Sequence, residues 1–531
     1  MPRLKTLFAR RPFPLHPLLF AAFPVLNLWA SNIEEDVGFR DVAWPLVISV
    51  GAAAVLTLVL TPLLRSARKA GLATTAVVFL FFAYGAIFRP IEGWTVGGVT
   101  IGRRELVLAV WVAVAIGAVF LAARARKYVP EITKGLNVIG AALVLLNAGQ
   151  IGYYNFRSTE PTRGIDVPRE LQNRPPLAPT VRKPDIYFFI FDTYAGEKVF
   201  REQFGFSNRP FLDFLERKGF YVANRSTANY PRTLLSLASE LNMRYLDFLT
   251  PRMGENTGDT APLKDMLQRH AVGKYLKDLD YTYVHLGSWW GPTARSPLAD
   301  INIKFKGLSE VAQNILEGTA LSQITGESFR KREYSRAWFN FRALEETARK
   351  VDSPKFVFAH FLVPHGPFVL DRNGRYVSLD VQSTRTRERN YLEQVMWLNK
   401  KLTEFVNRRL AVPRKQRPVI ILQSDEGPYE GEPTRWSERP RLKILYRKFF
   451  NLNAMYLPGV NLKRAGLYPT ISNVNTFRLL FNLYFEAGLP LLRDENFAFA
   501  DLKKHLYRFI RTTPLIRNGQ SQPLRATAAP P

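Results

Sequence analysis

Long apolar runs fill the first part of the chain and are absent from the rest. Crossing a bilayer takes roughly 20 mostly apolar residues, and several segments meet that length. They lie at about 13–31, 43–64, 71–88, 105–123 and 136–154. Prolines interrupt the first segment, which is the weakest of the five. The pattern predicts an N-terminal transmembrane α-helical bundle of about five helices over residues 1–155.

The charges between these segments predict how the bundle is oriented, because Lys and Arg gather in the short cytoplasmic loops of membrane proteins. The loop SNIEEDVGFRD, after the first segment, is acidic and is predicted to lie outside. Basic residues stand before the first segment and after the second and fourth: Arg3, Lys5, Arg10, Arg11, Arg65, Arg68, Lys69, Arg124, Arg126, Lys127 and Lys134. An odd number of crossings from a cytoplasmic N-terminus predicts a multi-pass protein of the inner (cell) membrane whose C-terminal domain is extracytoplasmic.

Short apolar runs alternate with helical patterns in the second part of the chain. The clearest runs are DIYFFIF (185–191), YTYVHL (281–286), KFVFAHF (355–361) and PVIILQ (418–423). Strands alternating with helices predict an α/β domain with a mostly parallel sheet and helices on both faces. The expected divisions are a Pro- and Arg-rich linker at 156–183, the α/β domain at 184–517 and a disordered tail at 518–531.

The amino-acid composition excludes some kinds of site and indicates the kind of partner. The chain of 531 residues has no cysteine, which excludes disulfides, a thiolate metal site and a catalytic thiol. Its formal net charge of +28 indicates attraction to anionic surfaces. The basic residues are scattered and form no nucleic-acid-binding motif. We therefore expect membrane lipid, and not nucleic acid, as the anionic partner.

Candidate ligands for a metal ion follow three of the four strand-like runs. Asp192 comes directly after DIYFFIF, and Asp425 and Glu426 come after PVIILQ. His360 lies in KFVFAHF, and His365 follows it. Ligands bind beyond the carboxyl ends of the strands of an open parallel sheet, so these residues are expected to share one cleft. Asp, Glu and His side chains are suitable ligands for a divalent cation.

A candidate nucleophile lies in the segment ANYPRTLLSLASEL. Pro231 suits the first turn of a helix, which puts Thr233 near a helix N-terminus. The partial positive charge there, together with an adjacent metal, would lower the pKa of the hydroxyl and activate it. Ser236 and Ser239, in the same segment, and Thr193, directly after Asp192, are the alternatives.

Four motifs give the chain a resemblance to a known family. FIFDTYAG, NYPRTLLSLAS, HFLVPHGPF and LQSDEGP stand in the order and rough spacing of the alkaline phosphatase superfamily. The chain resembles its membrane-bound sulfatase-like branch, which includes lipoteichoic acid synthases and phosphoethanolamine transferases. Proteins of that branch have five N-terminal helices and an extracytoplasmic catalytic domain. The resemblance covers nearly the whole chain and implies an alkaline-phosphatase-like domain with a divalent metal ion (Mn, Zn or Mg).

The resemblance also implies roles for individual residues. Asp192 matches the acidic metal ligand after the first strand, and Asp425 matches the Asp of the Ser-Asp-His-Gly motif. Thr233 matches the threonine nucleophile, which is also a metal ligand. His365 matches the catalytic histidine that contacts substrate phosphate or metal, with His360 as a further substrate contact.

Glu426 departs from the family pattern, because a metal-binding histidine usually stands there. Its carboxylate can still bind Mn²⁺, Mg²⁺ or Zn²⁺ through oxygen. The expected function is a metal-dependent phosphotransferase or phosphoesterase of the cell envelope. It would move a phospho-group from a lipid donor to a glycan or lipid acceptor through a Thr nucleophile. The alternatives are a sulfatase-like ester hydrolase and a non-catalytic relic that binds an envelope component, which the Glu426 substitution favours.

Overall fold

The chain forms two compact units. The computed structural model describes residues 12–32, 39–91, 94–96, 99–157, 171–172, 178, 181–306, 310–428, 434–436 and 442–518. The first unit comprises Met1–Thr159 and Gly307–Phe329, and the second comprises Glu160–Lys306 and Arg330–Pro531. Most of the predicted linker at 156–183, and the predicted tail beyond residue 518, lie outside the described residues.

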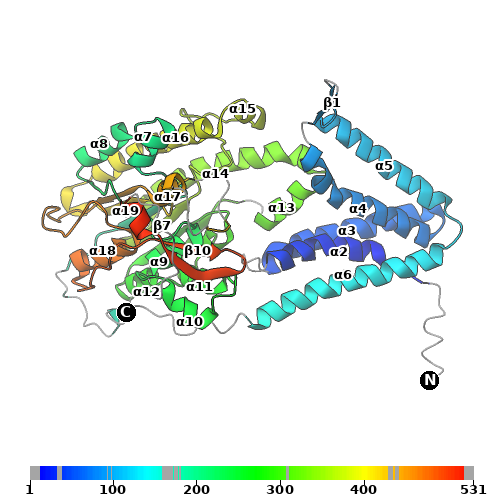
Figure 1. Ribbon diagram of the computed structural model, residues 1–531, viewed down its shortest axis with the longest axis horizontal. Helices are drawn as coiled ribbons and strands as arrows, with labels where there is room; N and C mark the ends of the chain where they lie inside the picture. Colours follow the sequence, from blue (N-terminus) through cyan, green and yellow to red (C-terminus); the bar gives the residue numbers. More distant parts are fainter. Residues whose placement is uncertain are drawn as a thin grey trace. The chain divides into compact units, whose positions relative to one another are not determined.

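Four helices of the first unit are long and apolar enough to cross a membrane (Figure 1). They are α3 (Phe39–Leu64), α4 (Ala67–Ile91), α5 (Arg104–Arg124) and α6 (Val129–Arg157). Many large apolar side chains on them are exposed, among them Leu58, Ile116 and Leu145. Exposed apolar surface of this kind suits contact with lipid, where the hydrocarbon chains replace a protein core.

The first of the five predicted spans is shorter in the structure than the sequence predicts. Residues 13–31 were expected to cross the membrane, and the helix found there, α2 (His16–Ser31), has 16 residues. At ~1.5 Å per residue it reaches about 24 Å, short of a hydrocarbon core of ~30 Å. Among the described residues the helices with the length and composition of a span therefore number four, against about five expected.

Three further elements belong to the first unit. They are β1 (Thr95–Val96), β2 (Val99–Thr100) and α13 (Glu310–Gly318). Ile315 of α13 packs against the small apolar cluster of Val25 and Val42, and the Ala320 N–H donates to the Phe81 carbonyl at 3.2 Å. Ile315 and Ala320, expected within the 184–517 domain, thus pack with the N-terminal helices.

A seven-stranded sheet forms the centre of the second unit. Its strands, in spatial order, are β4 (Tyr221–Val222), β9 (Asn453–Tyr456), β8 (Val419–Gln423), β3 (Ile186–Phe191), β7 (Lys355–Phe361), β5 (Thr282–Gly287) and β6 (Ile301–Lys304). The β3–β7, β3–β8, β5–β7 and β5–β6 pairs are parallel. The β8–β9 and β4–β9 pairs are antiparallel. The predicted α/β domain with a mostly parallel sheet is confirmed, and all four predicted strands belong to it.

The second unit also contains helices, of which α14 begins within the first unit, and a hairpin. The helices are α7 (Glu197–Phe204), α8 (Arg209–Arg217), α9 (Thr233–Leu241), α10 (Thr250–Met253), α11 (Ala261–Gln268), α12 (Ala271–Asp278), α14 (Ser322–Lys350), α15 (Leu379–Ser383), α16 (Arg387–Leu410), α17 (Leu442–Phe449), α18 (Thr476–Phe485) and α19 (Thr513–Asn518). The hairpin consists of β10 (Phe497–Asp501) and β11 (His505–Arg511). Local chemistry sets such boundaries: the Thr386 hydroxyl accepts the Arg389 N–H at 3.2 Å and caps the start of α16.

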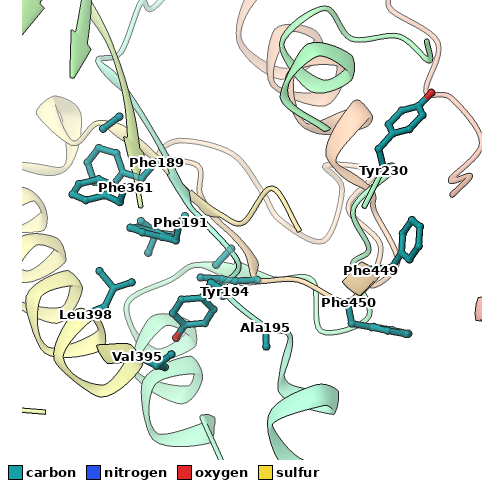
Figure 2. Packing of buried hydrophobic residues seen from close by; sticks show 14 of the residues in the cluster. Phe189, Phe191, Tyr194, Ala195, Tyr230, Phe361, Val395, Leu398, Phe449 and Phe450 are labelled. Carbon is teal, nitrogen blue, oxygen red and sulfur yellow. The ribbon is translucent and has the colours of Figure 1, made fainter. Parts of the chain in front are cut away.

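The core lies on both faces of the sheet, which explains why β3 reads as an unbroken apolar run. Successive side chains of a strand point to opposite faces. Phe189 and Phe191 belong to one buried cluster, and Phe188 and Ile190 belong to another. Figure 2 shows the first cluster, with the rings of β3 and β7 beside apolar side chains of α16: Phe189, Phe191, Phe361, Val395 and Leu398.

Candidate metal centre

Three carboxylates meet at the carboxyl ends of the central strands. Asp192 follows β3 directly, and Asp425 and Glu426 follow β8 after one residue. Because β3 and β8 are parallel neighbours, both strands end at the same edge of the sheet. One oxygen from each of the three carboxylates lies within 4.8 Å of the others, and all three residues are buried. We call Asp192, Asp425 and Glu426 the acidic trio.

Hydrogen bonds fix the two loops that carry the acidic trio. The Ser424 hydroxyl donates to the Phe191 carbonyl at 2.7 Å and accepts the Tyr194 N–H at 2.9 Å. The Ser424 carbonyl accepts the side-chain amides of Asn451 at 2.6 Å and Asn473 at 3.0 Å. All of these groups are buried, so the loop after β8 is held against the loop after β3. The sequence motifs include Ser424 and Tyr194 but not Asn451 or Asn473.

The same network orients Asp425. Its Oδ1 accepts the N–H groups of Thr193 at 3.2 Å and Glu426 at 2.8 Å, and its carbonyl accepts the Ser236 hydroxyl at 2.7 Å. In the described part of the chain, Asp425 Oδ2 and Glu426 Oε2 are buried without a hydrogen bond of good geometry. Buried carboxylate oxygens left this way are costly. A divalent cation would satisfy them, and an all-oxygen set suits Mg²⁺ or Mn²⁺ and is compatible with Zn²⁺.

The pKa shifts of the acidic trio also favour a bound cation. Burial, followed by repulsion from Asp425 and Glu426, raises the pKa of Asp192 well above its usual value. Burial raises the pKa of Glu426 to about 7, although the Lys448 ammonium lowers it. Burial also raises the pKa of Asp425. Three buried carboxylates that repel one another are the arrangement that a cation stabilises.

Thr233 reaches the acidic trio from the first position of α9. A hydrogen bond with its side chain counteracts the rise in the pKa of Asp425. The other hydroxyls of this helix are already donors: Ser236 donates to the Asp425 carbonyl, and Ser239 donates to a backbone carbonyl at 2.7 Å. Thr193 is buried, whereas Thr233 is half-buried and so more open to a substrate.

The two candidate histidines lie outside the group of three carboxylates. His365 lies in the loop after β7, with Nδ1 2.7 Å from the Gly366 carbonyl. Burial lowers its pKa, and the Lys448 ammonium lowers it further. His360, inside β7, is buried with Nδ1 2.9 Å from the Thr293 hydroxyl. Burial lowers the pKa of His360 to about 3, so its ring is neutral at physiological pH.

Lys448 is a charged residue of this site that the sequence did not indicate. Its Nζ lies 2.6 Å from Glu426 Oε1, and both side chains are fully buried. In the sequence it stands in YRKFFN at the end of a basic helical stretch, beside other Lys and Arg residues. No local signal distinguishes a buried lysine from an exposed one in such a stretch, because the difference arises from packing.

Comparison with solved structures finds similar chains of low sequence identity. One is lipooligosaccharide phosphoethanolamine transferase A of Neisseria meningitidis, an integral membrane protein, at 12% identity and a TM-score of 0.39, covering 88% of this chain and 95% of that one. Another is the C-terminal periplasmic domain of EcEptC from Escherichia coli, at 12% and 0.41, covering 65% of this chain and 99% of that one. A third is an alkaline phosphatase superfamily protein of Vibrio parahaemolyticus, at 12% and 0.37, covering 67% and 83%.

Comparison with family models and with curated proteins finds no match. The similar solved structures are named for the same group of proteins that the four sequence motifs resemble. With TM-scores of 0.37 to 0.41, these similarities are descriptive only, and the chemistry of the site rests on its own residues.

Proposed function

We propose that the protein is a membrane-anchored, divalent-metal-dependent phosphotransferase of the cell envelope that uses Thr233 as its nucleophile. The observation that carries the proposal is the acidic trio, whose buried and unsatisfied oxygens lie beside a threonine at a helix N-terminus. A carboxylate cluster next to a hydroxyl is what metal-assisted phosphoryl transfer requires. The membrane-spanning helices keep the site on a chain attached to lipid.

Each residue of the site would have its own role in phosphoryl transfer. Asp192, Asp425 and Glu426 would hold the cation, which would supply a Lewis acid to the reaction. The Thr233 hydroxyl attacks the phosphorus of a lipid phosphodiester, forming an oxygen–phosphorus bond as the bond to the donor alcohol breaks. The hydroxyl proton ends on the departing alcohol. His365 would contact the phosphate oxygens, and attack by an acceptor hydroxyl would then release Thr233.

The first test is a labelled-lipid assay on the full chain in detergent with Mn²⁺. Wild-type protein is expected to carry the phospho-label on Thr233, located by mass spectrometry of its peptides. Thr233→Ala should remove the label, while at saturating Mn²⁺ the acidic trio should still retain bound metal, measured by elemental analysis. Ser239→Ala is the matched control, because that hydroxyl lies in the same helix and already donates to a carbonyl. A label on Thr193, or no label with metal bound, would contradict the role of Thr233.

Two alternatives are separated by the same assay. Release of phosphate-bearing product to water without an added acceptor would indicate a hydrolase. The non-catalytic alternative is favoured by the Lys448–Glu426 ion pair, because an ammonium already neutralises one carboxylate of the site. Absence of both metal and label under every loading condition would support that alternative.

A further inference from the structure

The ion pair between Lys448 and Glu426 is buried at the edge of the acidic trio. Both side chains have no exposed surface, and Nζ lies 2.6 Å from Oε1. A lysine is almost never fully buried unless it is paired, and removing one partner of such a pair leaves a costly buried charge. The backbone supports the contact, since the Gly427 N–H donates to the Lys448 carbonyl at 2.8 Å.

The net charge of the acidic trio together with Lys448 matches the charge of one divalent cation. Three ionised carboxylates and one ammonium leave a net charge of two negatives, which one divalent cation neutralises. A site with two aspartates and a neutral histidine, the pattern of the family that this chain resembles, has the same net charge. Arg232 also lowers the pKa values of Asp192 and Glu426, but it is half-buried, so solvent weakens its effect.

We infer that Lys448 is a positioning residue that adapts the site to a glutamate in place of a histidine. Its ammonium holds Glu426 Oε1, so that Oε2 remains for the cation, and it cancels the extra negative charge that the glutamate brings. This inference rests on the proposed function in one respect, namely that the acidic trio binds a divalent cation.

Two substitutions and their combination test the inference on the full chain in detergent, with thermal unfolding and bound metal as readouts. Lys448→Met is expected to lower the Tm in EDTA and to enlarge the rise in Tm that Mn²⁺ produces, because an uncompensated carboxylate attracts the cation more strongly. Glu426→His is expected to weaken Mn²⁺ binding at least tenfold, because the unpaired ammonium repels the cation. The double variant should recover both the Tm in EDTA and the binding of one cation, with a shift in preference toward Zn²⁺.

A matched control exists at the opposite end of the sheet. Lys355, which is buried, and Asp185, which is half-buried, form another ion pair, at 2.7 Å, beside the amino ends of β7 and β3. Lys355→Met should therefore lower the Tm equally in EDTA and in Mn²⁺.

The outcomes separate the inference from the proposed function. If Lys448→Met behaves like Lys355→Met, or if the two site substitutions are additive in the double variant, Lys448 is a packing residue and the inference is overturned. If the wild-type protein binds no cation, the proposed function fails. Recovery of the Tm in EDTA by the double variant would then still support the pairing of Lys448 with Glu426.

Discussion

Protons and cations compete for the oxygens of Glu426, and this competition sets how the site responds to pH. Burial raises the pKa of Glu426 to about 7, and Asp192 and Asp425 are shifted in the same direction. In the unfolded chain a glutamate titrates near 4.3. The folded, metal-free protein therefore retains protons that the unfolded chain has already lost between these two values.

The sign of the pH dependence follows from linkage. Because the folded state binds the extra protons, raising the pH from 5 to 8 should lower the Tm of the metal-free protein. Mn²⁺ should reverse the trend, since its apparent affinity rises as Glu426 loses its proton near pH 7. Thermal unfolding at pH 5, 6, 7 and 8, in EDTA and in Mn²⁺, measures both effects. Glu426→Gln should reduce the dependence, and a wild-type Tm in EDTA that rises with pH would contradict the assigned shift.

At the scale of elements, the loop after β8 and the end of α17 approach each other unusually closely. Gly427 stands in this loop, and a Cβ placed on it would lie 2.0 Å from the Arg447 carbonyl oxygen. No side chain fits there unless the backbone moves. The glycine thus permits the contact that brings Lys448, one residue further along α17, to Glu426.

Gly427→Ala should therefore separate the loop from α17. Overpacking of a buried contact costs typically ~1–3 kcal/mol, and this clash with backbone belongs at the upper end. We expect a lower Tm and at least tenfold weaker Mn²⁺ binding, measured by thermal unfolding and metal titration. Gly326→Ala is the control: a Cβ there meets nothing within 4 Å, and alanine favours the helix. Equal effects of the two substitutions would show that the close approach has no part in the site.

At the scale of the whole molecule, the charges around the four long helices predict on which side of the membrane the C-terminal domain lies. The charged loops flanking α3 to α6 predict that domain outside whether or not α2 crosses the membrane, because α2 affects only the side on which the N-terminus lies. The loop before α3 is acidic, and the loops after α3 and α5 are basic. The positive-inside tendency then puts α6 across the membrane toward the outside.

The absence of cysteine makes this orientation easy to measure. Lys127→Cys, between α5 and α6, and Ser383→Cys, in α15, each introduce one exposed thiol. In intact spheroplasts a membrane-impermeant maleimide should label the Ser383→Cys protein, and the Lys127→Cys protein only after lysis. The unsubstituted chain should stay unlabelled in both cases. Labelling of both thiols before lysis, or of Lys127→Cys alone, would contradict the predicted orientation.

The sequence by itself determined the α/β class, the four central strands and the apolar helices of the N-terminal part. These features depend on the local spacing of apolar residues. That spacing shows whether a segment is buried on one face, buried on both faces or exposed to lipid. It also pointed to Asp192, Asp425 and Glu426, because polar residues that end buried parallel strands must meet at one edge of the sheet. The roles of Thr233 and His365 remain predictions, as does the contact between His360 and substrate.

The tertiary structure decided what depends on contacts between distant residues. It placed Lys448 beside Glu426 and the side chains of Asn451 and Asn473 on the Ser424 carbonyl. It packed Ile315 and Ala320 with the N-terminal helices and limited α2 to 16 residues. The sequence does not distinguish a buried lysine from an exposed one, because burial depends on tertiary packing. Only the packing around Lys448 shows that it belongs to the site.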